Sequence, residues 1–339
     1  MKIDVQCHIF PKSFIGELSS PNSQLKVMSS DATGRRVIVD SKTNDEVTFY
    51  IDNSCYVDAE AHIRDMDYFK IDKQILSLPT PSVDKVNDPN DALHLSKLIN
   101  DEIASIVRKY PERFLGFATI PMNDPALATK EIERAVVKLG FKGIVVSSNT
   151  QGKFYDAEDY DIVFETLQRL KVPMFIHPTE PVAGKQIGQD YKLTLIFGWP
   201  FDTTLCVSRL VFSGLFERYP DLKIIAAHGG GMIPFFAGRI DMLARVAAGG
   251  GKRIQVQKPA EAFKKLYYDA AFFNADSLEL LARFAGSDRI VYASDYPFGG
   301  DLGKNCYAQS IAMMERAQLD RETKDKIYGK NIASLLNIS

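Results

Sequence analysis

Tyr292-Ala-Ser-Asp295-Tyr-Pro-Phe298 closes the last short apolar run of the chain with a single carboxylate, Asp295. The run over 289–293 predicts a buried strand, and Pro297 breaks the backbone directly after it. A parallel α/β barrel places catalytic or metal-binding acids at the C-terminal tips of its strands. Taken alone, Asp295 is explained equally well as a helix cap or a turn residue. The earlier strands are needed to decide between these two roles.

The rest of the chain alternates short apolar runs with amphipathic segments. Eight runs predict strands, at 3–7, 73–78, 114–118, 143–146, 173–176, 222–227, 266–269 and 289–293. The intervals predict helices at 58–69, 90–110, 124–139, 158–170, 203–218, 233–246, 277–284, 306–316 and 321–336. Alternating strands and helices predict a parallel sheet, and eight such units predict a closed (β/α)8 TIM barrel of the α/β class. The alternative, an open doubly wound sheet, is disfavoured because no GxGxxG follows the first strand.

Residues 12–57 do not follow this alternation. Two runs of alternating polarity, at 36–40 and 46–51, flank a polar segment at 41–45, which predicts a β-hairpin inserted after the first strand. Long loops after barrel strands usually serve the active face. We therefore expect one barrel domain over 1–339, with 12–57 as an inserted hairpin segment and two helices closing the chain.

Composition narrows the classes of function. The chain has 339 residues, of which 45% are hydrophobic and 25% are charged, as in an ordinary globular protein. A net charge of -2 gives no field that would attract nucleic acid or a membrane surface, and no run of about 18 apolar residues predicts a membrane span. The first strand begins almost at Met1, with no apolar signal segment before it. Four cysteines without a CxxC pair predict reduced thiols in a cytoplasmic protein.

Three of the five histidines, His8, His177 and His228, come immediately after predicted strands, as Asp295 does. Because a barrel gathers its strand tips at one end, we expect these four side chains to meet there. Histidine and aspartate together suit a divalent metal of the zinc type. Any one of them alone would more often be structural, and the four together favour a site. The remaining histidines fall in predicted helices and are expected to be surface or packing residues: His62 and His94.

Five motifs, spread over nearly the whole chain, carry a family resemblance: Ile3-Asp-Val-Gln-Cys-His8-Ile-Phe-Pro11, Tyr110-Pro-Glu-Arg-Phe114, Phe175-Ile-His177-Pro178, Ala227-His228-Gly-Gly-Gly-Met-Ile-Pro-Phe235 with Gly238-Arg239, and Ser294-Asp295-Tyr-Pro-Phe298. With them the sequence resembles the amidohydrolase-related decarboxylases typified by aminocarboxymuconate-semialdehyde decarboxylase, in the amidohydrolase superfamily. The His-Gly-Gly-Gly and Ser-Asp-Tyr-Pro-Phe segments are specific in combination, whereas either alone would be weak.

The resemblance implies a metal site at His8, His177 and Asp295, with Gln6 where the first histidine of the family's His-x-His pair usually stands. A glutamine amide is a neutral, weak ligand that suits harder metals better than zinc. Three roles for Gln6 compete: a weak ligand, a hydrogen-bond partner of a metal-bound water, or the mark of an impaired site. We expect a retained but weakened site for one divalent ion, zinc first and manganese second. No organic cofactor is expected, because no nucleotide-binding fingerprint is present.

The resemblance also implies roles around the metal. His228 is similar to the family's acid–base residue, and either it or Asp295, with a metal-bound water, handles the proton that replaces the lost carboxylate. Arg239 is similar to an arginine that grips the substrate carboxylate through its guanidinium fork. Three aromatic residues follow strand tips and are expected to wall an aromatic pocket: Trp199, Phe201 and Phe298.

One departure from the family concerns the inserted hairpin. Relatives carry a second arginine just before the segment that matches 53–55, but residues 50–53 contain none here. This departure argues against the dicarboxylic aminomuconate as substrate. Arg35 and Arg36, at the start of the hairpin, are the available substitutes.

We therefore predict a metal-dependent, non-oxidative decarboxylase, a carboxy-lyase, that acts on an unsaturated or aromatic carboxylic acid. Its expected partners are a small-molecule carboxylate and, by resemblance, a second copy of the chain in a homodimer. The same barrel and metal also suit hydrolysis of an amide, ester or lactone, because a fold does not fix a function. Gln6 and the missing hairpin arginine further fit a third alternative, a binding protein whose catalysis is impaired.

Overall fold

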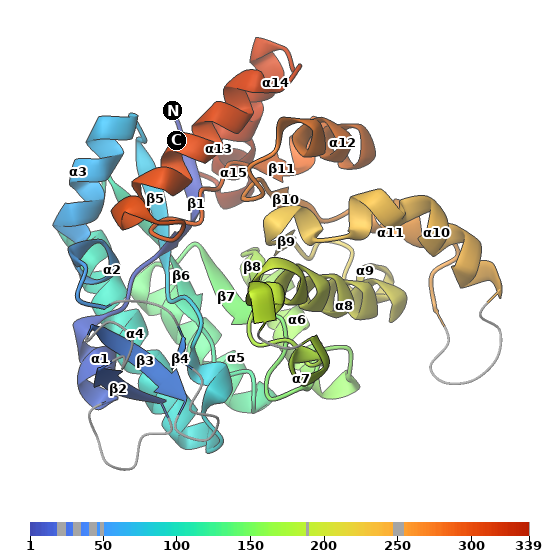
Figure 1. Ribbon diagram of the computed structural model, residues 1–339. Coiled ribbons are helices and arrows are strands. Elements are labelled where there is room, and N and C mark those ends of the chain that lie inside the picture. Colours follow the sequence, from blue (N-terminus) through green and yellow to red (C-terminus); the bar gives the residue numbers. More distant parts are fainter. Residues whose placement is uncertain are drawn as a thin grey trace.

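The computed structural model describes residues 1–18, 25–29, 35–40, 46–47, 51–187, 190–246 and 254–338. Within them, eight parallel strands form one sheet that curls into a barrel (Figure 1). In sheet order the strands are β1 (Ile3–His8), β5 (Lys73–Ser77), β6 (Phe114–Thr119), β7 (Gly143–Ser147), β8 (Met174–His177), β9 (Ile224–Ala226), β10 (Tyr267–Asp269) and β11 (Ile290–Val291). These are the eight predicted strands, and the predicted (β/α)8 fold class is confirmed.

The barrel closes where the chain just after β11 runs beside β1. Val5 N donates a hydrogen bond to Tyr292 O at 3.1 Å, and His8 N donates to Tyr296 O at 2.8 Å. Cys7 and Tyr296 also form a parallel bridge. The last strand is short, so these bonds beyond its end complete the ring and fix the backbone that leads to Asp295.

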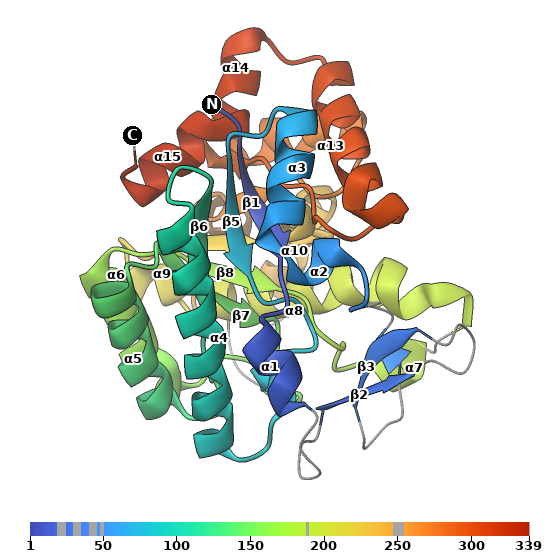
Figure 2. The same ribbon diagram turned by 90° about the vertical axis from the view of Figure 1, so that its left-hand side faces the viewer.

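Helices cover the outside of the barrel (Figure 2). The principal ones are α3 (Ala59–Phe69), α4 (Pro89–Lys109), α5 (Pro125–Glu133), α6 (Asp161–Leu170), α8 (Trp199–Phe212), α10 (Ile233–Val246), α12 (Ala275–Ala285) and α13 (Lys304–Arg316). The shorter ones are α1 (Lys12–Glu17), α2 (Ser54–Val57), α7 (Gly184–Ile187), α9 (Leu215–Arg218), α11 (Pro259–Phe263), α14 (Arg321–Asp325) and α15 (Asn331–Leu336). Aspartates begin three of the principal helices, and each accepts a hydrogen bond from a backbone N–H of the first turn: Asp58 before α3, Asp88 before α4 and Asp124 before α5.

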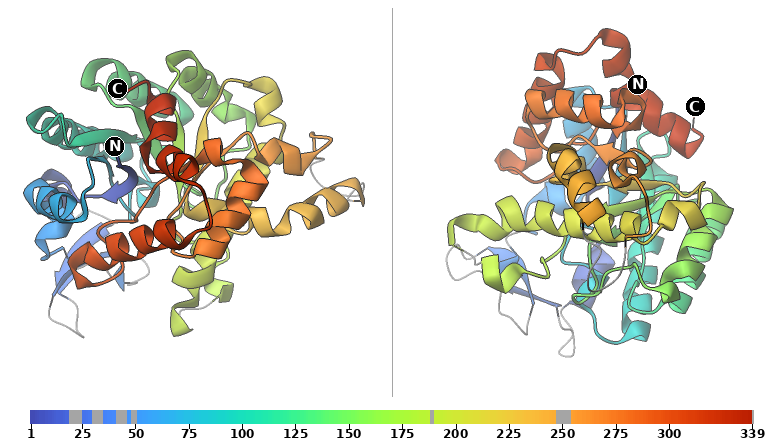
Figure 3. Two further views of the ribbon diagram at one scale, coloured as in Figure 1. Left: turned by 90° about the horizontal axis from the view of Figure 1, so that it is seen from above. Right: turned by 90° about the vertical axis from the view of Figure 1, so that its right-hand side faces the viewer.

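Two hydrophobic clusters hold the fold together. The larger one lies between the barrel and its helices. The smaller one fills the barrel interior with side chains such as Val5, Phe117 and Phe175, and it includes Ile332 and Leu336 of α15. Seen from above, α15 and both chain ends lie close to the start of β1 (Figure 3). The interior is therefore packed and covered at the end where strands begin, which leaves the opposite end for chemistry.

The inserted segment forms a small antiparallel sheet. Strand β3 (Arg36–Asp40) pairs with β4 (Glu46–Val47), as the predicted hairpin requires. A further strand, β2 (Leu25–Ser29), pairs with β3 on its other side and was not predicted, because its short run does not alternate clearly. Ile51, placed at the end of the second predicted run, lies in a turn instead. Residues 41–45 and 48–50 lie outside the described part of the chain.

One helical stretch, Asp190–Phe212, is long and apolar enough by composition to cross a membrane. Its second half is α8, whose Cys206, Val207 and Leu210 are buried in the core shared with the barrel. The apolar residues of α8 are thus explained by packing within the protein.

Candidate metal centre and active site

The pleat of the strands decides which side chains reach the mouth of the barrel, the end where the strands stop. Alternate residues of a strand face the same side. Phe175 faces the interior, so His177, two residues on, extends the same column to the mouth. In the same way Asp295 follows the interior residue Ala293 by two positions.

Strand β1 reaches the same point by means of a bulge. Val5 belongs to the interior cluster, so simple alternation would place Cys7 inside and both Gln6 and His8 outside. The register with β5 shifts by one residue between Asp4 and Cys7, and Cys7 packs in the outer core. The bulge therefore turns Gln6 and His8 toward the mouth, as bulges beside active sites commonly do.

His8, His177 and Asp295 come together at the mouth. One potential ligand atom from each lies within 4.8 Å of the other two. The two imidazole rings meet edge to face, with centroids 4.7 Å apart. His8 Nε2 lies 3.2 Å from Asp295 Oδ1. Side chains from β1, β8 and the end of β11 thus converge where the sequence predicted a site.

Hydrogen bonds on the far side of each ring orient the nitrogen lone pairs. His177 Nδ1 lies 2.9 Å from Pro178 O, which can only accept, so we assign the ring proton to Nδ1. His8 Nδ1 lies 3.2 Å from Ser77 Oγ, and that hydroxyl donates to Cys7 O, so His8 takes the same tautomer. Burial lowers the pKa of His177 well below its usual value. In the neutral form of each ring, Nε2 is therefore the nitrogen that offers a lone pair to a cation.

These nitrogens fit a divalent cation. Among the described residues, neither His8 Nε2 nor His177 Nε2 has a hydrogen-bond partner, although both are buried. In that tautomer, the approach of His8 Nε2 to Asp295 Oδ1 brings together two atoms that both offer lone pairs. Ligands of one ion, with bonds of about 2.1 Å, lie about 3.0–3.4 Å apart, which matches the 3.2 Å separation. A shared cation would satisfy all three side chains.

Gln6 lies between the acid and the third histidine of the site. Its Nε2 donates to Asp295 Oδ1 at 2.8 Å and lies 3.3 Å from His228 Nε2. If the amide were turned over, its Oε1 would face the carboxylate, and two acceptors would oppose each other. The hydrogen bond therefore supports the orientation in which Nε2 faces Asp295. Oε1 is buried without a partner in the described residues. In this orientation Gln6 positions Asp295, and ligation through Oε1 would require the amide to turn.

His228 and Asp295 share an unusual backbone conformation. Their φ angles are 53° and 60°, in the left-handed region that costs a non-glycine residue about 1–2 kcal/mol. Such strain gathers at functional sites. The glycines after His228 have a steric reason as well: Gly230 has φ of 71°, and a Cβ there would lie 2.6 Å from the ring of Tyr268. The His-Gly-Gly-Gly motif is thus the tight turn that presents His228.

Charges around His228 favour its protonated form. Burial alone would lower the pKa of His228, but the carboxylates of Asp295 and Asp269 outweigh it and raise that pKa. Burial likewise acts to raise the pKa of Asp295, yet its interaction with the neighbouring His228 holds that pKa well below its ordinary value. His228 Nε2 lies 3.7 Å from Asp295 Oδ2, so the pair is an ion pair without a short hydrogen bond.

A family model described as amidohydrolase matches residues 3–338. The chain belongs to the amidohydrolase family. It is 30% identical to the 2-amino-3-carboxymuconate-6-semialdehyde decarboxylase of Dictyostelium discoideum, over all of this chain and 92% of that relative. The predicted membership among the amidohydrolase-related decarboxylases is confirmed.

Two solved structures resemble this amidohydrolase along its whole length. The 5-carboxyvanillate decarboxylase of Sphingomonas paucimobilis has a TM-score of 0.84 and 25% identity, covering 100% of this chain and 99% of that one. The dihydroxybenzoic acid decarboxylase of Polaromonas sp. JS666, solved with bound manganese and the inhibitor 2-nitroresorcinol, has a TM-score of 0.82 and 28% identity, covering 99% and 96%.

The residues predicted to bind substrate in this amidohydrolase are only partly gathered. Phe298 is half-buried, with its ring centroid 5.2 Å from that of His8 and 5.7 Å from that of Tyr56. Trp199 is half-buried at the start of α8. Arg239 is exposed on α10 and makes no hydrogen bond or ion pair with another described residue. Phe298 thus lies beside the site, and its role in substrate binding, like the roles of Trp199 and Arg239, stays a prediction.

The hairpin does bring one arginine to the segment that lacks one. An Nη2 proton of Arg35 is donated to Asn53 Oδ1, just before α2. Its charge also lowers the pKa of Tyr56, although burial is the larger influence and leaves that pKa raised overall. Since Tyr56 packs beside Phe298, Arg35 lies on the same side of the mouth as the aromatic wall.

Sequence analysis missed one buried acid of the site, Asp269 at the end of β10. Its Oδ1 accepts hydrogen bonds from Gly229 N at 3.4 Å and Ala271 N at 3.2 Å, so it holds the turn that carries His228. Burial raises its pKa to about 6. A signal was available, because Asp269 ends a predicted strand as Asp295 does.

Proposed function

We propose that this amidohydrolase is a metal-dependent carboxy-lyase that removes CO2, without oxidation, from an aromatic or unsaturated carboxylic acid. The observation that carries the proposal is the convergence of His8, His177 and Asp295 beside His228, in a chain whose relatives are decarboxylases. The predicted carboxy-lyase activity agrees with the names of those relatives, whereas the hydrolase alternative gains no support from them.

The metal would be held by His8, His177 and Asp295. Manganese is the better candidate than the zinc expected from sequence, because a related decarboxylase binds manganese and a neutral glutamine, in place of a further histidine, stands beside the ligands. When bound, the ion would polarise the oxygens of the substrate carboxylate and its neighbouring substituent. Asp295 remains ionised under these charges and is suited to ligation.

The chain's own residues must supply the proton that replaces CO2. Loss of CO2 leaves an electron pair on carbon, and one proton delivered to that carbon completes the balance of atoms and charge. His228 is charged more readily than an ordinary histidine, and its Nε2 faces Asp295 across 3.7 Å. We assign His228 as the residue that holds this proton, with the Asp295 carboxylate stabilising its charged ring. Phe298 would exclude water from one side of the substrate ring.

The activity is tested with the purified protein loaded with manganese or zinc. A panel of hydroxybenzoates, carboxyvanillate-type acids and an aminomuconate is offered, with CO2 release as the readout. A parallel panel of lactones and amides tests the hydrolase alternative. We expect CO2 from at least one aromatic acid and no ring opening; lactone hydrolysis without CO2 release would contradict the proposal.

The part played by Gln6 is tested by metal affinity. Gln6→His supplies an imidazole, and Gln6→Leu removes both polar atoms at similar size. We expect Gln6→His to bind zinc about 10–100-fold more tightly than the unmodified chain, as is usual when a position beside a metal is optimised. Titration with a competing chelator measures this without turnover. Equal affinities in all three proteins would mean that Gln6 does not influence the metal.

We also propose that the protein forms a homodimer. Phe235 and Met242 of α10 are 77% and 56% exposed, and Arg239 lies between them. Grouped exposed apolar side chains commonly mark association surfaces. Light scattering should give twice the chain mass, and Phe235→Ser with Met242→Ser should shift the species toward monomer. A monomeric unmodified chain would contradict the proposal.

A cytoplasmic location is likewise proposed. It is supported by four cysteines that are all free and buried, as expected for thiols in a reducing compartment: Cys7, Cys55, Cys206 and Cys306.

A further inference from the structure

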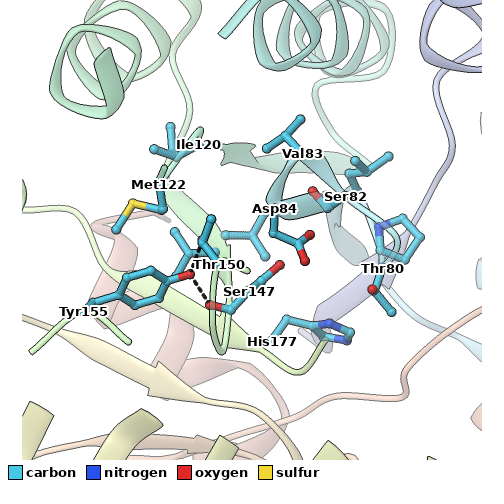
Figure 4. Close-up of a pocket in the computed structure, with 14 residues that line it drawn as sticks. Thr80, Ser82, Val83, Asp84, Ile120, Met122, Ser147, Thr150, Tyr155 and His177 are labelled. Carbon is cyan, nitrogen blue, oxygen red and sulfur yellow. Dashed lines mark hydrogen bonds between the residues drawn. The ribbon is translucent and has the colours of Figure 1, made fainter. Parts of the chain in front are cut away.

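A small cavity opens beside His177, between the loop after β5 and the end of β7 (Figure 4). Its polar lining consists of Asp84, His177 and five hydroxyl residues: Thr80, Ser82, Ser147, Thr150 and Tyr155. Its volume of about 10 Å³ corresponds to one water-sized group. The cavity therefore has room for one substituent of a substrate bound at the metal, and not for a whole ring.

Asp84 directs an unsatisfied oxygen into this cavity. The residue is only 5% exposed, and Figure 4 shows its carboxylate pointing toward Ser147 and His177. Oδ2 accepts a hydrogen bond from Thr179 Oγ1 at 2.8 Å. Oδ1 has no hydrogen-bond partner anywhere in the described residues. Because buried polar atoms are nearly always hydrogen-bonded, we expect this oxygen to accept a hydrogen bond from a donor outside the protein.

Three hydroxyl groups in and beside the cavity already donate their protons to protein atoms. An ionised carboxylate can only accept, so Thr179 donates to Asp84, and Thr80, whose Oγ1 lies 3.1 Å from Thr179 Oγ1, must donate to Thr179. Tyr155 donates to Ser147 O at 2.7 Å. The hydroxyls of Ser82 and Ser147 also line the cavity, yet Asp84 Oδ1 still has no donor among the described residues.

We propose that this cavity is a specificity subsite that receives a single hydrogen-bond-donating substituent of the substrate, an aromatic hydroxyl or an amino group, which donates to Asp84 Oδ1. The inference rests on the proposed decarboxylase function, because it assumes a ring whose carboxylate lies near the metal ligand His177. Asp84 excludes a second carboxylate from this position, since two anions would be buried together without a cation. A methoxy substituent is also disfavoured in this subsite, because its oxygen has no proton to donate to Asp84 Oδ1.

The experiment compares ring acids that differ in one substituent: hydroxyl, amino, methoxy or carboxylate. We expect the unmodified enzyme to prefer the hydroxyl- and amino-substituted acids over the methoxy- and carboxylate-substituted acids by at least about 100-fold in kcat/KM. Sites built around a hydrogen bond discriminate to this extent. Asp84→Asn is nearly isosteric. With its oxygen held by Thr179, it would turn an NH2 group into the cavity and reverse the preference toward methoxy and carboxylate. Asp159→Asn, the same change at an exposed residue, should leave the preference unaltered.

Binding without turnover separates the two proposals. Calorimetry with the manganese-loaded protein measures a phenolic product and its methyl ether, for the unmodified chain and for Asp84→Asn. If phenol is preferred and Asp84→Asn reverses this, while no acid releases CO2, the subsite stands and the decarboxylase fails. If acids are decarboxylated but Asp84→Asn leaves every preference unchanged, the cavity holds a buried water only and the subsite is overturned.

Discussion

The barrel interior and the barrel mouth are built by the same strands, yet they obey opposite rules. In the barrel interior, side chains such as Val5, Phe175 and Val291 form an apolar cluster, and α15 covers it at the end where the strands begin. Two or more positions farther along the same strands, the interior column turns polar. There His177 Nε2 and Asp269 Oδ2 are buried without partners among the described residues.

The difference separates the source of stability from the source of function. Apolar packing in the interior needs no ligand and stabilises the chain by itself. The unsatisfied atoms of the mouth cost stability until a ligand meets them, which is the usual price of a preorganised site. Changes at the mouth should therefore affect turnover with little loss of stability, and changes in the interior should do the reverse.

The largest expected effect comes from the mouth. His228→Ala removes the residue that we assign to proton transfer, and we expect kcat to fall about 10²- to 10⁴-fold. Metal content, measured by elemental analysis, should stay nearly intact because His228 is outside the ligand group. His94→Ala, at an exposed position of α4, is the matched control. Unchanged turnover in His228→Ala would remove the acid–base assignment.

The interior gives the next largest effect. Phe175 is fully buried and lies two residues before His177. Phe175→Ala should lower the free energy of unfolding by about 3–5 kcal/mol, because it leaves a cavity in a packed barrel. Urea denaturation of the metal-free protein measures this, with His228→Ala beside it as the mouth variant. If Phe175→Ala and His228→Ala lost the same free energy of unfolding, the contrast between the barrel interior and its mouth would be wrong.

Much of the barrel could be predicted because the sequence shows two patterns together: short apolar runs typical of buried strands, and apolar residues at helical spacing between them. Apolar runs separated by helical spacing give the strand order, and the closure of a barrel then brings distant strand tips together without any knowledge of contacts. His8, His177 and Asp295 were found in this way. Asp269 could have been found by the same rule, since it ends β10.

Other features of the site depend on the register between strands and on contacts between loops. Neither can be read from the order of residues in a single sequence. Alternation along β1 places Cys7 with Val5, and only the shifted pairing with β5 reveals why His8 faces the mouth. Asp84 lies in a short turn after β5, where neither strand nor helix periodicity applies. Its role depends on Thr179 of another loop, 95 residues away.

The smallest expected effect tests a histidine that lies away from the mouth. His62 of α3 is fully buried, with Nδ1 2.7 Å from Gln74 Oε1 and Nε2 2.9 Å from Cys55 O. Burial is the largest influence and lowers its pKa, although these two hydrogen bonds and nearby Asp65 and Asp58 act in the opposite direction. In contrast to the metal-facing rings, both nitrogens of His62 already have protein partners, so its titration reports on this buried environment and not on the metal site.

A lowered pKa in the folded state means that the unfolded chain takes up the proton first as pH falls. Stability linked to His62 should therefore be complete above about pH 6.5 and decline below it, until the folded pKa is reached, by at most about 1.4 kcal/mol per pH unit. The measurement is the pH dependence of urea unfolding for the metal-free protein and for His62→Gln, whose difference isolates this ring, with His94→Gln as the exposed control. A difference of the opposite sign, with His62 more stabilising as pH falls, would mean that Gln74 and Cys55 hold the ring charged. Burial would then be the weaker influence even in this packed part of the fold.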